Sequence, residues 1–72
     1  MAYSAADLQM VDDHIAQGER HIQLQHALIE RLKSHGLPTE QAEELLTEFE
    51  ATLLQHREHR DLMVLSMASG SP

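Results

Sequence analysis

The chain has 72 residues and no cysteine, so neither a disulfide framework nor a thiolate metal site is available to it. A chain of this length buries only about 60% of the surface that its unfolded form exposes, so association is the expected source of further stability. The 12 acidic residues outnumber the 5 lysines and arginines, and the formal charge of -7 opposes binding to nucleic acid or anionic lipid.

No uninterrupted apolar run approaches about 18 residues, the length that a membrane span requires. Residues 1–10 contain neither a basic segment nor an apolar core of the kind found in signal peptides. We therefore expect a cytoplasmic protein that does not enter the membrane. The aromatic residues are one tyrosine and one phenylalanine, which argues against a large pocket walled by rings.

The first predicted helix covers residues 5–35. Ser4 is placed to cap it, and Asp7 follows three residues later, where a carboxylate suits a helix N-terminus. Apolar residues then recur at alternating spacings of three and four, interrupted only by Gly18 and Gln25, and this pattern predicts a coiled-coil seam. In heptad notation the a positions are Leu8, Ile15, Ile22 and Ile29, and the d positions are Val11, Gly18, Gln25 and Leu32.

A turn is predicted at residues 36–39. Gly36 suits the left-handed residue that ends a helix, and Pro38 prevents the helix from continuing. Thr39 is expected to cap the second helix, whose first turn and a half is rich in glutamate. A loop this short forces the two helices to run antiparallel.

The predicted fold is therefore all-α: one domain over residues 1–72, an antiparallel two-helix hairpin of coiled-coil type. The second helix is expected over residues 40–67, and residues 68–72 are expected to be a disordered tail. Its seam has d positions at Ala42, Phe49, His56 and Met63, and a positions at Leu46, Leu53 and Arg60.

Folding the chain at the turn predicts which residues face each other. Gly18 is expected opposite His56, where the missing side chain leaves room for the imidazole. On one flank the expected pairs combine opposite or potentially opposite charges: Lys33 with Glu43, Glu19 with Arg57, and His26 with Glu50. On the other flank they are Leu28 with Leu45, His21 with Thr52, and His14 with His59. Exposed charge pairs are worth only about 0.2–1 kcal/mol each, so they indicate register more than stability.

The second of these flanks is expected to be an interface. Leu28, Leu45 and the neighbouring Leu24 carry no charge pair, and burying apolar surface contributes about 25 cal/mol per Å². Covering them with a second hairpin would stabilise a marginal fold, so we expect a homodimer that closes as a four-helix bundle. The alternative is that these are single exposed leucines, which are normal on a protein surface.

A second apolar patch is predicted at the open end of the hairpin, over residues 62–67. Leu62 and Leu65 belong to a run whose apolar residues occupy too many faces of the helix for one seam to cover. The residues expected to join it from the first helix and its N-terminus are Tyr3, Leu8, Met10 and Val11. The patch is either a docking surface or a frayed end covered by the chain's own N-terminus. Leu54 is a b position outside the flank of Leu28 and Leu45, so either the interface is wider than this flank or Leu54 is simply exposed.

The chain has 6 histidines, which raises the question of a metal site. His14, His56 and His59 are the candidates, since the last two are three residues apart and His14 is expected to face His59. His21 lies about 10.5 Å from His14 along the helix axis, too far to share an ion with it. The pattern contains no Glu-x-x-His of the di-iron type, so no resident metal or cofactor is predicted. Protonation of His14, His21 and His59 near about pH 6 is an alternative use, because it would add repulsion along the flank that also carries Leu28 and Leu45.

No catalytic residue is predicted, because the carboxylates and hydroxyls lie on solvated helix faces or at caps and do not converge. The leading interpretation is a non-enzymatic structural or protein-interaction module that acts as a homo-oligomeric hairpin. The alternative is a metal- or pH-responsive sensor built on the histidines at the open end.

One further pattern consists of residues 14–20, Gln25, Leu28, Ile29, Gly36, residues 42–46, Phe49, Glu50, Leu53, His56 and residues 59–61. At these positions the chain resembles an uncharacterised family of short alphaproteobacterial proteins, conserved hypothetical helical hairpins. The resemblance covers roughly residues 11–63. It implies a freestanding cytoplasmic hairpin and transfers no catalytic residue.

Overall fold

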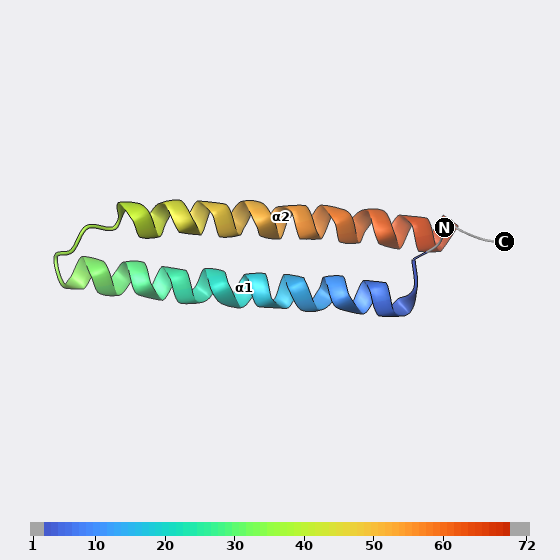
Figure 1. Cartoon of the computed structure of the whole chain (residues 1–72), viewed down its shortest axis with the longest axis horizontal. Coiled ribbons are helices and arrows are strands. Elements are labelled where there is room, and N and C mark those ends of the chain that lie inside the picture. Colours follow the sequence, from blue (N-terminus) through green and yellow to red (C-terminus); the bar gives the residue numbers. More distant parts are fainter. Residues whose placement is uncertain (1–2, 70–72) are drawn as a thin grey trace.

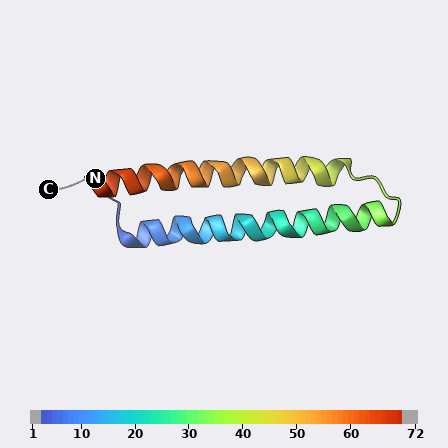
Figure 2. The ribbon, with the colours of Figure 1, turned by 180° about the vertical axis from the view of Figure 1, so that it is seen from behind.

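The computed structural model of the chain describes residues 3–69, which form two helices, α1 (Ala5–Ser34) and α2 (Glu40–Ser69). The helices lie side by side and run antiparallel, with the turn at one end and both ends of the described chain at the other (Figures 1 and 2). The predicted all-α hairpin is therefore confirmed. The molecule is an elongated rod of 60 × 15 × 13 Å.

The start of α1 is fixed by a reciprocal capping box, as the sequence predicts. The Asp7 amide donates to the Ser4 hydroxyl (3.1 Å), and the Ser4 amide donates to Asp7 Oδ2 (3.0 Å). Two interactions with Ser4 hold the pKa of Asp7 below its ordinary value of 3.8. The larger is the hydrogen bond from the Ser4 amide, and the smaller is the hydrogen bond with the Ser4 side chain. The carboxylate is therefore the form that the cap stabilises.

The end of α1 is a Schellman motif. Gly36 has the predicted left-handed backbone, with φ of 67°. The Leu37 amide donates to the Leu32 carbonyl (2.9 Å), and the Gly36 amide donates to the Lys33 carbonyl (3.0 Å). These two bonds satisfy carbonyls that have no partner further along the helix.

The second helix departs from the sequence predictions at both ends. The Thr39 hydroxyl donates to the Glu43 carboxylate (3.1 Å), whereas the expected cap would have it accept from a backbone amide. At the C-terminal end, Ala68 and Ser69 continue the helix, so the prediction of a disordered tail is wrong for these two residues. Alanine favours the helix, and the first strong helix breaker is Gly70. The rest of the expected tail, residues 70–72, lies outside the described residues.

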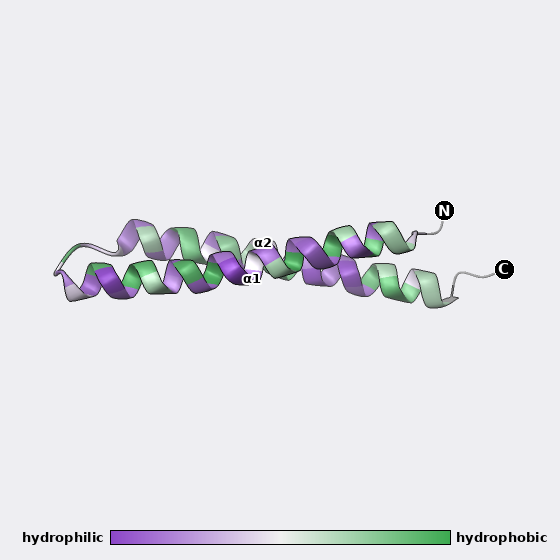
Figure 3. Cartoon of the chain, turned by 90° about the horizontal axis from the view of Figure 1, so that it is seen from below, coloured by the Kyte–Doolittle hydropathy of each residue, from purple (hydrophilic) through white to green (hydrophobic). Residues whose placement is uncertain are grey.

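The predicted seam is the contact between the helices. Every a and d position named above is buried or half-buried, and the two ribbons cross near the middle of the hairpin (Figure 3). Among the described residues the only buried hydrophobic side chains are Ile29, Leu53 and Met63. The hairpin thus has a thin core, as expected for two helices with no third layer.

Among the described residues, Gln25 is the one buried polar side chain, with 7% of its surface exposed. Its Nε2 donates to the Ala42 carbonyl at 2.8 Å. A buried amide requires such a partner, because an unsatisfied one costs about 1–3 kcal/mol. The bond ties the middle of α1 to the first turn of α2.

The predicted register is wrong by about one turn. An added Cβ at Gly18 would lie 3.2 Å from Leu53 Cδ1, and the three nearest atoms all belong to Leu53, so this leucine and not His56 packs against the glycine. The turn is the cause, because residues 36–39 run back along the hairpin and α1 reaches farther toward the loop end than α2 does (Figure 1). The predicted register requires instead that the two helices extend equally far toward the turn.

Candidate interaction surfaces

The flank predicted to be an interface presents exposed leucines near the loop. Leu24 is 67% exposed and Leu45 is 41% exposed, whereas Leu28 is half-buried against the other helix. We call these three residues the leucine flank. Their g and c heptad positions place them side by side on one face of the hairpin, beside the seam that holds the helices together.

The open end carries the second predicted patch. Leu62 and Leu65 are each 65% exposed, and Met10 on α1 is 57% exposed. The ribbon is predominantly hydrophobic at this end of both helices (Figure 3). A cavity of about 250 Å³ opens here, lined mainly by Tyr3, Met10, Val11, His59 and Met63.

Between these two regions, aromatic and imidazole rings line a narrow cleft of about 150 Å³ on the same side of the hairpin as the leucine flank. The His14 and His56 rings lie 5.4 Å apart between centroids, and those of His21 and Phe49 lie 5.6 Å apart. The Nδ1 atom of His56 is buried and has no hydrogen-bond partner within residues 3–69. We call this the histidine cleft. It continues the leucine flank toward the open end.

The three histidines proposed as metal ligands do not come together. His14 meets His56, but the His59 ring packs edge-on against Tyr3, 5.9 Å away. The expected pair of His14 and His59 is wrong for the same reason as the register. Within residues 3–69, no group of three or more histidine or acidic side chains is placed to hold a metal ion.

The opposite flank is charged, and one of its predicted pairs is confirmed: Arg57 donates to Glu19 at 3.1 Å. Lys33, expected to meet Glu43, lies instead 3.8 Å from Glu30 on its own helix. These pairs are exposed by about half, so each contributes little to stability. We call this side of the hairpin, made of the e and b positions, the charged flank.

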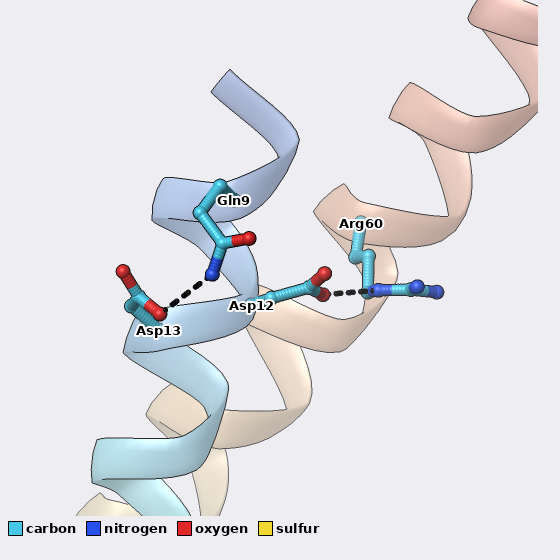
Figure 4. Close-up of polar contacts among 4 residues, drawn as sticks. All are labelled: Gln9, Asp12, Asp13 and Arg60. Atoms are coloured by element: carbon cyan, nitrogen blue, oxygen red, sulfur yellow. Dashed lines mark hydrogen bonds and ion pairs between the residues drawn. The ribbon is translucent and has the colours of Figure 1, made fainter. Parts of the chain in front are cut away.

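A further ion pair on this side was not predicted. Arg60 Nε donates to Asp12 Oδ1 at 2.5 Å and bridges the two helices, while Asp13 accepts from Gln9 on α1 itself (Figure 4). Arg60 is an a position of the predicted seam, and no charge partner was expected for it. An acidic residue at the neighbouring e position of α1 was the available signal.

Neither α1 nor α2 combines the length and the apolar character needed to cross a bilayer. Comparison with models of protein families, with curated proteins and with solved structures found no match to this chain.

Proposed function

We propose that this chain is a cytoplasmic, non-enzymatic interaction module that self-associates through the leucine flank to form a four-helix bundle. We also propose that the chain belongs to the family of short alphaproteobacterial helical hairpins that its sequence resembles. Two features of the hairpin together support the proposed self-association. The described residues bury few apolar side chains, and Leu24 and Leu45 are exposed on its surface. Small chains without disulfides or metals gain stability by association.

The accessible surface supports this proposal quantitatively. A compact monomer of 8.1 kDa is expected to expose about 4,500 Å², whereas this chain exposes 5505 Å². The excess of about 1,000 Å² is similar to the roughly 800 Å² that each partner buries in a typical stable interface. Covering one flank with a second hairpin would therefore leave each chain exposing about as much surface as a compact monomer of its own size.

The charges favour the leucine flank as the side that is covered. Its g and c positions hold few ionised side chains between the two ends of the hairpin, mainly Arg31 and Glu48. Two copies of a chain with a charge of -7 repel each other, so contact through the face with fewest carboxylates has the smallest electrostatic penalty. The histidine cleft would then lie inside the interface.

The test is Leu24→Glu, with Leu54→Glu as the matched control. The two leucines are 67% and 56% exposed, so neither substitution disturbs the hairpin core, but Leu54 lies on the charged flank. Sedimentation equilibrium should give twice 8.1 kDa for wild type and for Leu54→Glu, and a monomer for Leu24→Glu. A monomeric wild type, or a dimer that Leu24→Glu leaves intact, contradicts the proposal.

A pH-responsive version is the second candidate, supported by the rings of the histidine cleft. Protonation of His14 and His56, whose rings lie 5.4 Å apart, places two like charges at the proposed interface. The dimer fraction should fall between about pH 8 and pH 5, and a His14→Gln, His56→Gln double variant should lose this dependence.

A further inference from the structure

The charged flank contains a second apolar surface that the proposed dimer does not use. A cleft of about 430 Å³ is lined by both helices, with apolar side chains from Ile22, Leu53 and Leu54 and charged side chains from Glu19, Glu50 and Arg57. Its size is within the range of about 300–1,000 Å³ that is usual for ligand sites in proteins.

Two residues of this cleft have no role within the hairpin. Leu54 is 56% exposed at a b position, away from the seam. Within the described residues Glu50 makes no ion pair and no side-chain hydrogen bond, although its expected partner, His26, lies on the same flank. An apolar side chain and an unpaired carboxylate therefore lie side by side at the opening of one cleft.

We infer that this cleft binds a basic amphipathic helix of another protein. The groove between two antiparallel helices is shaped to accept a third helix. Together the three helices would form a three-helix bundle. One apolar side chain of that helix would enter the cleft against Leu54, and a lysine or arginine one turn away would pair with Glu50. A second basic residue of the bound helix would lie near Glu19, whose carboxylate already forms an ion pair with Arg57 (3.1 Å).

Charge complementarity decides between this occupant and a second copy of the chain. The copy would bring its own excess of carboxylates, and its charged flank would place Glu50 near like charges. A cationic helix instead gains from the chain's charge of -7, which also accelerates its approach. The two flanks are thus suited to different partners.

The experiment uses two 14-residue model peptides built from leucine and lysine, or from leucine and glutamate, in the same amphipathic pattern. Fluorescence anisotropy measures binding of each labelled peptide to the full chain. The leucine–lysine peptide should bind, and Leu54→Ala and Glu50→Lys should each weaken the binding by about tenfold. The leucine–glutamate peptide should not bind.

Matched variants separate the cleft from general charge attraction and from dimer formation. Glu44→Lys makes the same charge change as Glu50→Lys at an exposed position away from the cleft, and should leave the dissociation constant within about twofold. Leu24→Glu, which tests the dimer, should also leave peptide binding intact. No binding by wild type, or equal losses for Glu44→Lys and Glu50→Lys, would overturn the inference. Neither result bears on the dimer.

Discussion

Replacing Gly18 with alanine is expected to stabilise the hairpin. Gly18 lies in the interior of α1, where alanine is favoured over glycine by about 0.8–1.0 kcal/mol. The opposing effect is one close contact, since the added Cβ would lie 3.2 Å from Leu53 Cδ1. That distance is about 0.3 Å below the lower end of the usual separation of packed carbon atoms, which is about 3.5 Å.

Leu53 has space to relieve this contact, because its side chain lines both the cleft of the charged flank and the histidine cleft. A rotation of about 10° about χ1 moves Cδ1 by about 0.4 Å, and it costs about 0.1–0.2 kcal/mol when scaled from the cost of a 30° departure. The net gain is then about 0.7 kcal/mol, which should raise the melting temperature by about 3–5 °C.

Gly36→Ala is the matched control, because it is the same chemical change with the opposite expected sign. Apart from Gly36 and its two chain neighbours, no described residue has an atom within 4 Å of the Cβ that would be added there, but φ is 67°. An alanine in this left-handed conformation costs about 1 kcal/mol. Thermal unfolding followed by circular dichroism, with all samples at one protein concentration, compares the two variants. If Gly18→Ala were destabilised as much as Gly36→Ala, Leu53 would be unable to move and the reasoning would be refuted.

Three further substitutions test other parts of the hairpin. Asp12→Asn should lower the free energy of unfolding by up to about 1 kcal/mol in low salt and by less in high salt. The control Asp13→Asn removes a contact within α1 and should change this free energy by less than about half that amount. Equal effects of the two substitutions in a urea titration would contradict this prediction. Gln25→Ala should cost about 2 kcal/mol, because it removes both a buried hydrogen bond and packing volume, and an unchanged urea midpoint would argue against it. The folded-state pKa of Asp7 is lowered, so its contribution to stability is present above the unfolded-state pKa and is lost as the pH falls through the folded-state value, below 3.8. The acid unfolding curve of Asp7→Asn should lack that component, and superimposable curves would exclude it.

The parts of the fold that depend on local sequence could be predicted well. The heptad spacing identified the buried face of each helix, and the capping box at Ser4 and the left-handed Gly36 follow from residues within one turn of each other. Such features require no knowledge of the partner helix. They are therefore present in the sequence itself.

The register could not be predicted, because it depends on the path of the turn. Residues 36–39 run back along the hairpin before α2 begins, which shifts one helix relative to the other by about a turn (Figure 1). The long side chains of Glu19 and Arg57 still reach each other across this offset. The shorter ring of His14 does not reach His59 and meets His56 instead. Long charged pairs are therefore a poor test of register, and ring contacts are a stricter one.

The two flanks also explain why the apolar pattern of α2 is difficult to assign from sequence. Leu53 belongs to the seam, Leu45 to the leucine flank and Leu54 to the charged flank, so a single helix presents leucine on three faces. A helix that serves one interface shows a single stripe. Leucine on three faces is the pattern expected of a helix with three partners: α1, a second hairpin and the basic helix inferred above.

This interpretation makes a prediction about the double variant. Leu24 and Leu54 lie on opposite flanks and share no contact, so substitutions at the two positions should act independently. Leu24→Glu combined with Leu54→Ala should be monomeric, like the first single variant, and should bind the leucine–lysine peptide as weakly as the second. If dimer formation instead created or blocked the peptide site, Leu24→Glu alone would change the peptide affinity. The dissociation constant of the leucine–lysine peptide is measured for wild type, the two single variants and the double variant, at protein concentrations above and below those at which the dimer forms. These values distinguish independent flanks from coupled ones.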